Sequence, residues 1–440
     1  MRGIAIVAAA AAMPWVAAGA AAAAMPSTAS HLSAIEVFNL AGKLSEAGQI
    51  AAAAKLYDAL ARDPDPEIRA EARFRKGMMY AAAKHYEQAA EAFRALLNEK
   101  PDAARVRLEL ARVLAAMGDE SGARKQLRQA EASGLPPDVA VTVDQFARTI
   151  RSPKRFGGSI RLAIAPDSNI NRATQSRTLD TVIAPIVLSR DARATSGVGL
   201  DVSGQTFAKF GVADDLSIVP RLSGSADLYR EHEFNDISGV ALLGLEWRRG
   251  KDKWSPAAGH SWRWFGNAPY VRSWVGSLEW LHPLGKRGQI VVSGSASATH
   301  YLRNPLQSGA LYSLTATIDR ALDVRTGAEI TLSATRQTAR DPGYATASGG
   351  VSLLGWRDLG AATIFASAGV TRTEGDARLF LFPERRREWL AAGRLGATLR
   401  RFSVHGFAPT ASIAYERNFS TVGLYDYRRI AATFGIVRSF

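Results

Sequence analysis

The stretch RIAATFGIVRSF, Arg429 to Phe440, ends the chain and alternates between two kinds of residue. One face of an extended chain would carry Ile430, Ala432, Phe434 and Ile436, and the other would carry Arg429, Ala431, Thr433 and Gly435. A strand with an apolar row toward lipid and a polar row toward a lumen has this pattern. Phe434, Ile436 and the terminal Phe440 therefore read as a barrel-assembly signal, although Arg438 interrupts the apolar row where an aromatic is preferred.

The same period of two runs through the chain from Phe156 onward. Clear examples are residues 312–319, 329–335, 363–371 and 410–416. Each has one apolar face and one face of small polar residues. In a soluble sandwich the apolar faces would meet in a core, whereas in an outer-membrane barrel they would face lipid. The alternation alone leaves both folds open.

Aromatic residues and turn lengths favour the barrel. An interfacial girdle would suit the aromatics near expected strand ends, namely Trp247, Trp254, Trp274, Trp280, Trp356, Trp389 and Phe419. Short turns are expected at 284–287, 323–326, 359–360 and 400–403, and longer loops at 250–269, 303–310, 338–345, 373–387 and 419–426. About 285 residues at about 20 per strand predict roughly 14 antiparallel strands over 156–440.

The N-terminus has the features of an export signal. Arg2 supplies a positive charge, residues 4–12 an apolar core, and the alanines around Ala18 to Ala24 small-residue cleavage sites. Residues 1–24 are therefore predicted to be a signal peptide, with a retained anchor as the alternative. Beyond residue 30 no uncharged apolar run reaches the roughly 18 residues that a membrane helix requires.

Residues 30–150 are predicted to form a helical repeat domain. Apolar residues recur there at helical spacing, and two segments match at an offset of 34 residues. The aligned pairs are Gly77 with Ala111, Tyr80 with Leu114, Lys84 with Gly118, Ala89 with Ala123, and Phe93 with Leu127. A weaker copy begins near Ala41, so the pattern is similar to about three tetratricopeptide repeats, with a plain helical bundle as the alternative. Residues 151–155 would be a linker, because Pro153 blocks helix continuation.

Composition excludes several classes of protein. The chain has no cysteine, so disulfides, thiolate metal sites and a cysteine nucleophile are excluded. Of the net charge of +14, residues 151–440 carry +13, from 37 Lys and Arg against 24 Asp and Glu. No basic helix with interleaved aromatics accompanies this charge, so we expect no nucleic-acid binding. No catalytic or metal-binding motif is present, and we expect neither an enzyme nor a cofactor.

One dense polar motif follows the first expected strand, 157–164. It is Pro166-Asp-Ser-Asn-Ile-Asn171, with Asp167, Ser168, Asn169 and Asn171 as candidate site residues. Such side chains hydrogen-bond to nearby backbone and stabilise tight turns. A contact with calcium or with cargo is the alternative interpretation.

These segments together resemble the Slam family, the surface lipoprotein assembly modulators of Gram-negative bacteria. The resemblance rests on the export signal, the repeats, the Pro153 linker, the Gly157-Gly158 strand, the Asp167 to Asn171 motif and the terminal Phe440. It implies a periplasmic repeat domain followed by a 14-stranded outer-membrane barrel that moves cargo proteins to the cell surface. The implied cargo is a surface lipoprotein or a secreted haem- or metal-acquisition protein.

Three functions are thus compared. The first is a translocator whose partners would be an exported cargo protein, the barrel-assembly machinery and outer-membrane lipid. The second is an anion-selective diffusion porin with an arginine-rich lumen, since 32 of the 37 basic residues in 151–440 are arginine. The third is an adhesin or assembly scaffold that binds a partner through loops such as Leu379 to Pro383 and Arg385 to Arg387.

Overall fold

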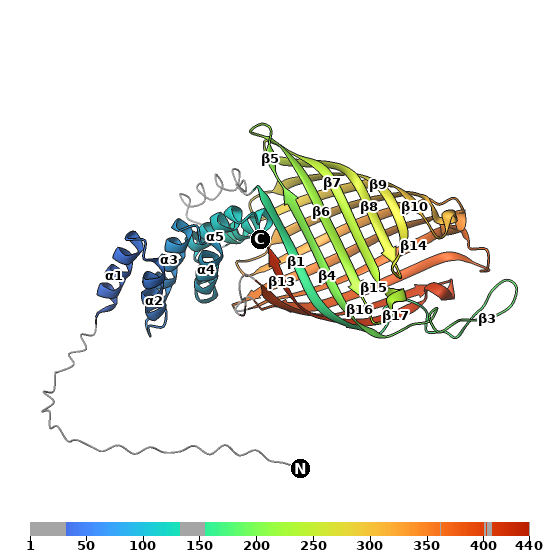
Figure 1. Ribbon diagram of the computed structural model, residues 1–440, viewed down its shortest axis with the longest axis horizontal. Coiled ribbons are helices and arrows are strands. Elements are labelled where there is room, and N and C mark those ends of the chain that lie inside the picture. Colours follow the sequence, from blue (N-terminus) through green and yellow to red (C-terminus); the bar gives the residue numbers. More distant parts are fainter. Residues whose placement is uncertain (1–31, 133–154, 361, 400–401, 403–406, 440) are drawn as a thin grey trace, which may run out of the picture.

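The computed structural model describes residues 32–132, 155–360, 362–399, 402 and 407–439. The predicted signal peptide 1–24, most of the predicted linker 151–155 and Phe440 lie outside these residues. Figure 1 shows a helical unit at one end of a long barrel, with β17 ending near the helices.

Six helices precede the barrel in the described part of the chain. They are α1 (Ala34–Glu46), α2 (Ile50–Leu60), α3 (Pro66–Ala82), α4 (Tyr86–Glu99), α5 (Ala104–Ala116) and α6 (Glu120–Ala132). Ser33 and Glu36 form a capping box at α1, and Asp65 caps α3 with Pro66 in its first turn. The turns inside each helix pair place Gly48, Lys84 and Gly118 at positive φ, which shows the same hairpin geometry repeated three times.

The predicted repeat alignment also explains how each pair packs. Gly77 of α3 faces the fully buried Phe93 of α4, and a Cβ on Gly77 would lie 2.5 Å from that ring. Ala111 of α5 and Leu127 of α6, at the equivalent positions, are buried together in the same cluster. Each pair therefore buries large side chains of its second helix against small residues of its first, as tetratricopeptide-type repeats require.

Fourteen antiparallel strands form a closed barrel in the described residues. They are β1 (Phe156–Asp167), β4 (Gly197–Ala208), β6 (Leu216–Leu228), β7 (Asp236–Arg249), β8 (Asp252–Phe265), β9 (Ala268–Leu284), β10 (Gly288–Tyr301), β11 (Gly309–Ala321), β12 (Thr326–Gln337), β13 (Thr346–Leu359), β14 (Ala362–Arg378), β15 (Arg385–Thr398), β16 (Ala408–Ser420) and β17 (Tyr427–Ser439). Each strand pairs with its neighbours in the chain, and β17 pairs with β1 to close the wall. The predicted number of strands and the antiparallel barrel are thus confirmed.

Short elements lie between these strands. The hairpin of β2 (Thr178–Leu179) and β3 (Ile186–Val187) lies in the β1–β4 connection, and β5 (Phe210–Gly211) extends the β4–β6 hairpin. Single 3-10 turns, η1 (His232–Phe234), η2 (Pro305–Gln307), η3 (Pro342–Tyr344) and η5 (Gly423–Tyr425), lie in four connections at the end far from the helices.

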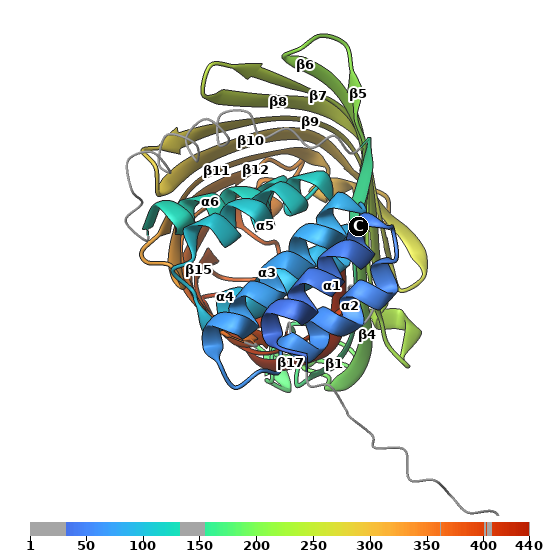
Figure 2. The ribbon, with the colours of Figure 1, turned by 90° about the vertical axis from the view of Figure 1, so that its left-hand side faces the viewer.

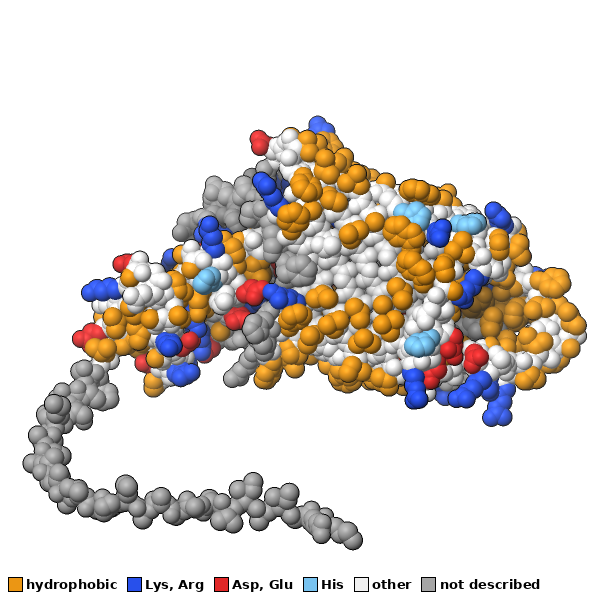
Figure 3. Space-filling view, in the orientation of Figure 1, with side chains coloured by type: hydrophobic (Ala, Val, Ile, Leu, Met, Phe, Trp, Pro, Cys, Tyr) orange, Lys and Arg blue, Asp and Glu red, His pale blue; other side chains and the backbone are white. Residues whose placement is uncertain are grey.

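The outer face of the barrel is apolar. Tyr312, Leu314 and Ile318 of β11 are 40–53% exposed, as the alternation predicts for a row that faces lipid. Figure 3 shows such hydrophobic side chains over the flank of the barrel. No helix in the described ranges is long and apolar enough to span a membrane.

The girdle prediction is wrong for Trp356. Trp247, Trp274, Trp389 and Phe419 are exposed on the outer face as expected. Trp356 shares the lumen side of the wall with its register partner Phe365, and Lys125 of α6 lies 3.4 Å from the centre of its ring. Its position within β13 decides the face, and an aromatic residue type alone does not.

Two loop predictions are also wrong. Residues 250–269 contain a complete strand, β8, between a turn at Gly250 and a tight turn at Gly266-Asn267, where all three residues have positive φ. Residues 373–387 are mostly strand, since β14 continues through a bulge to Arg378 and β15 begins at Arg385. Loops of six to eight residues agree with expectation at the predicted sites 303–310, 338–345 and 419–426.

Candidate functional site: a helix in the mouth of the barrel

The last helix of the repeat unit within the described residues, α6, lies across the opening of the barrel. Figure 2 shows α5 and α6 within the outline of the strands. One face of α6, with Ala123, Leu127 and Ala130, is buried in the repeat unit. Its other buried residues are polar, and they include Arg128 and Gln129, which face the barrel wall. A polar helix can be buried only where partners satisfy its charges and amides, and the lumen wall supplies them.

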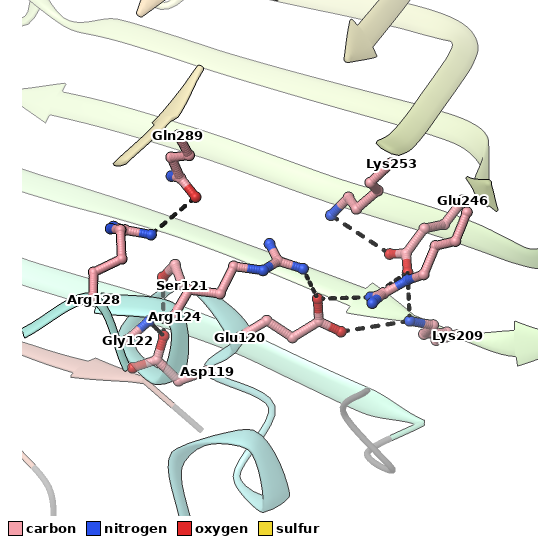
Figure 4. Close-up of polar contacts among 11 residues, drawn as sticks. Asp119, Glu120, Ser121, Gly122, Arg124, Arg128, Lys209, Glu246, Lys253 and Gln289 are labelled. Atoms are coloured by element: carbon pink, nitrogen blue, oxygen red, sulfur yellow. Dashed lines mark hydrogen bonds and ion pairs between the residues drawn. The ribbon is translucent and has the colours of Figure 1, made fainter. Parts of the chain in front are cut away.

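A cluster of charges holds the start of α6 against β4–β8 (Figure 4). The carboxylate of Glu120 lies 3.0 Å from the Arg248 guanidinium and 3.6 Å from the Lys209 amine. Arg124, one turn along α6, lies 3.2 Å from the same carboxylate. On the wall, Glu246 accepts from Lys209 and Arg248, both at 2.8 Å. We call Glu120, Arg124, Lys209, Glu246, Arg248 and Lys253 the mouth cluster.

The end of α6 binds a second part of the wall, on β10–β13, which β9 separates from β4–β8. Arg128 donates to the Asp319 carboxylate and, at 3.0 Å, to the Gln289 side chain. Gln129, which is fully buried, donates to the Val324 carbonyl at 3.0 Å and to the Asp358 carboxylate at 3.2 Å. Together with Lys125 on Trp356, these contacts make a second group, the far-wall contacts. The helix is thus bound at its two ends to two separate groups of strands in the lumen wall.

Arg107 of α5 connects the repeat unit to the far wall. Its guanidinium donates to the side chains of Gln126 and Gln129 at 3.0 and 3.1 Å and to the Val324 carbonyl at 2.6 Å. Burial lowers the pKa of Arg107 to about 10, so the group remains charged at neutral pH. Arg107 therefore holds the side chains of Gln126 and Gln129 in place, with the Gln129 amide directed to the wall.

The carboxylate of Glu120 is ionised in this setting. Burial raises its pKa, but the attraction of Arg248 and the neighbouring cations outweighs burial, and the pKa of Glu120 lies below its ordinary value. Protonation would remove the negative charge on which the helix side of the mouth cluster depends.

A cavity of about 960 Å³ remains between the helices and the wall. Its lining combines α4–α6 with lumen residues of β1, β4, β6–β10, β13 and β15–β17. The acidic lumen residues Glu246, Glu279 and Asp358 line it together with Lys253 and Arg221. At this end the cavity lining therefore carries charges of both signs, with Arg325 as a further wall cation.

The Asp167 to Asn171 motif lies at the other end of the barrel and forms a turn that is stabilised by hydrogen bonds. Asp167 accepts from the Asn169 backbone at 2.8 Å and from Arg429 at 2.7 Å. The side chain of Asn169 is fully buried and donates to the Ala173 and Arg428 carbonyls.

The remaining polar residues of the motif are also used within the chain. Ser168 accepts from the Ile430 backbone at 2.8 Å, and Asn171 donates to the Asp191 and Arg193 carbonyls. Within the described ranges, no group of three or more His, Asp or Glu side chains could hold a metal ion. The contacts agree with the turn interpretation of the motif.

The predicted assembly-signal residues lie on β17. Phe434 and Ile436 are 57% and 37% exposed on the outer face, whereas Phe440 lies outside the described residues. Arg438, which interrupts the apolar row, has a specific contact, because its guanidinium lies 2.9 Å from the Glu87 carboxylate of α4. The mouth cluster and this contact were not foreseen from the sequence. One signal was available, since α6 carries a charged or amide side chain at most positions and yet belongs to a repeat that must be buried.

Comparison with known proteins agrees with this architecture. Residues 156–440 match the family model for the surface lipoprotein assembly modifier, and residues 80–140 match a tetratricopeptide repeat model. A hemophilin secretion modulator from Acinetobacter baumannii is 21% identical over 227 residues, which are 48% of this chain and 46% of that protein. This chain therefore matches about half the length of that relative.

Similar solved structures are barrels at low identity. A loop-deletion form of OmpT, an outer membrane protein of Vibrio cholerae, gives a TM-score of 0.39 at 8% identity, covering 65% of this chain and 100% of that one. A bacterial polysaccharide outer membrane secretin gives a TM-score of 0.37 at 11% identity, covering 64% and 98%. The family model spans every strand of the barrel and well over half of the sequence, and the chain belongs to the surface lipoprotein assembly modifier family.

Proposed function

We propose that this protein is an outer-membrane translocator, without catalytic activity, that moves cargo proteins from the periplasm to the cell surface. The observation that carries the proposal is the binding of a repeat helix, α6, in the barrel mouth through ion pairs and amides. Repeat units of this kind present surfaces for other proteins. A repeat unit placed at the opening of a pore is suited to present a protein to that pore.

The orientation follows from the connections between strands. At the end that bears the helices, turns such as those after β9 and β13 are only a few residues long. At the other end the β1–β4 connection alone runs from 168 to 196 and carries its own hairpin. Outer-membrane barrels have short periplasmic turns and longer external loops, which supports a periplasmic repeat unit.

The proposed cycle depends on reversible docking. The mouth cluster and far-wall contacts are polar, so water and counterions can replace them when α6 leaves the wall. Cargo bound to the repeat unit would shift that balance, because only the undocked state leaves the opening free. The cargo would be a surface lipoprotein or a secreted haem- or metal-acquisition protein, and the named activity of the Acinetobacter relative supports this class.

Deletion of residues 32–132 tests the role of the helices. We expect the barrel to reach the outer membrane and to retain heat-dependent mobility in SDS gels, while cargo becomes trapped inside intact cells and resists external protease. Normal cargo display by this variant would contradict the role given to the repeat unit. A co-expressed hemophilin-like protein is the cargo with which to begin, and the full chain without cargo is the control for membrane integrity.

The porin alternative makes a different electrical prediction. A diffusion porin would show a steady, large and anion-selective conductance in planar bilayers. The docked helices and the mixed charges around the cavity favour a mostly closed pore with weak ion selectivity. For the adhesin alternative, Leu379 and Phe382 are buried in a cluster with Leu179 and Val422, so these loop residues are engaged within the protein.

A further inference from the structure

The edge of β1 that pairs with β17, which we call the seam, differs from the edge of β1 that pairs with β4. β1 pairs with β4 at every residue from Phe156 to Asp167. With β17 it pairs from Ser159 to Ile164, and then again only at Asp167. Pro166, which has no N–H to donate, lies in the gap. One strand is thus fully bonded on one edge and interrupted on the other.

Small residues line the lumen face of this seam, whereas its outer face pairs Leu162 with Ile436 and Ile164 with Phe434. A Cβ on Gly435 would lie 2.3 Å from the Leu162 carbonyl oxygen and 2.5 Å from the Ala163 Cβ. The backbones therefore approach closely, and Ala163, Ala431 and Gly435 offer little side-chain area to hold them together.

Side chains replace the ladder at the outer end of the seam. The Arg429 guanidinium of β17 lies 2.7 Å from Asp167 and 2.6 Å from Glu416 of β16. The hydroxyl of Ser168 accepts from the Ile430 N–H, and Asn169 donates to the Arg428 carbonyl. The motif residues thus connect the first strand to the last two by contacts that do not depend on the interrupted ladder.

At the inner end, β17 is attached to the helical unit. Arg438 pairs with Glu87 of α4 at 2.9 Å and lies over the Phe407 ring. Movement of the repeat unit would therefore act directly on the edge of β17, at the end of the seam that the motif does not hold.

From these contacts we propose that the β1–β17 seam is the part of the wall that opens laterally toward the bilayer, and that the Asp167 to Asn169 segment is the clasp that keeps its outer end closed. The inference rests on the proposed function. It supplies a route for a hydrocarbon anchor on the cargo, because the lumen side carries Ser, Thr and charged residues while the outer face beside the seam carries Leu162, Phe434 and Ile436. An acyl chain crosses such a wall at lower cost through an opening to lipid than through a polar lumen.

A disulfide across the seam tests the opening. The natural chain has no cysteine, so Leu162→Cys with Ile436→Cys, which are register partners on the outer face, gives one defined bond. The matched control is Ile330→Cys with Leu353→Cys, register partners on β12 and β13. We expect the oxidised seam variant to stop display of a lipidated cargo and the reduced form to restore it, with display by the oxidised control unchanged. Display by both oxidised variants, or its loss in both, would overturn the assignment to this seam.

The unfolding temperature of the barrel tests the clasp, the Asp167 to Asn169 segment. Asp167→Asn is expected to lower the temperature at which the barrel unfolds in SDS, and the Leu162–Ile436 disulfide should restore that temperature while the control disulfide should not. Asn171→Ala is the matched variant, because the hydrogen bonds of Asn171 to described residues all lie within the β1–β4 connection. Equal effects of the two substitutions would contradict the clasp.

Hydrogen exchange in nanodiscs separates this inference from the proposed function. Without any cargo, amides of β17 that face β1 should exchange faster than amides of β4 that face β1. Equal protection would overturn the seam even if the protein exports cargo. Failure of the wild-type protein to export cargo would overturn the proposed function and leave the exchange result to decide the seam.

Discussion

Replacement of Glu120 by Gln should release the start of α6 from the wall. The substitution keeps the shape of the side chain and removes its charge. The carboxylate faces Arg248, Lys209 and Arg124 within 3.6 Å, and its side chain is 15% exposed. In the variant, Arg124 would face Arg248 and Lys209 with no intervening anion from the helix.

The size of the effect follows from the partners that remain. A charge-assisted hydrogen bond contributes about 1.5–3 kcal/mol, and loss of one partner of a buried pair costs about 3–5 kcal/mol. Glu246 still compensates the wall cations in the variant. We therefore expect Glu120→Gln to destabilise the docked state by about 2–3 kcal/mol relative to the undocked state. That difference lowers the docking equilibrium constant roughly 30- to 150-fold.

Planar-bilayer recording measures the change. The wild-type pore should be closed for most of the time, and Glu120→Gln should raise its open fraction. Glu71→Gln is the control, since Glu71 is a half-exposed carboxylate of α3 whose ion-pair partner in the described part of the chain is Arg75. A double-mutant cycle with Arg248→Gln should give a coupling energy above about 1 kcal/mol. Identical open fractions for wild type and Glu120→Gln would refute the assignment of α6 as the closing element.

Three further outcomes follow from the same contacts. The pKa of Glu120 is lowered in the docked state. The contribution of Glu120 to docking is therefore complete above the ordinary glutamate pKa and is lost as pH falls through the lowered value. The open fraction should be constant near neutral pH and rise below about pH 4. Arg128→Gln should weaken docking by about 3–4 kcal/mol and increase limited proteolysis of the repeat unit in the detergent-purified protein, because Asp319 loses its cation. Lys125→Met should weaken docking by only about 0.5–1 kcal/mol in the same assay, since a cation–π contact on Trp356 is lost but apolar contact is kept.

The barrel could be predicted because its signals are local. Alternation along β11 and β17 places apolar residues outward without any knowledge of the partner strand. The same reasoning missed the strand at residues 252–265. The outward-facing residues of β8 include Pro256 and His260 as well as Trp254 and Trp262, so this strand has no continuous apolar face. The Gly266-Asn267 pair was the available sign of a hairpin.

The docking site could not be predicted, because it is defined by pairs of residues distant in sequence. Glu120 and Arg248 are separated by 128 residues, and nothing local distinguishes Glu120 from an exposed helix carboxylate such as Glu71. The repeat alignment identified α6 as the second helix of a pair. It could not show that the polar face of that helix is covered by a barrel instead of by solvent.

The two ends of α6 are held unequally, and this determines how the mouth would open. When α6 leaves, the wall cations of the mouth cluster still have Glu246, which pairs with Lys209, Arg248 and Lys253 without help from the helix. On the far wall, Arg128 is the one cation paired with Asp319 among the described residues, and departure would leave that carboxylate uncompensated. Release at the mouth cluster therefore costs less than release at the far wall. The helix should leave the β4–β8 wall first and swing about its far-wall contacts, so the first opening forms beside the β4–β8 side of the cavity.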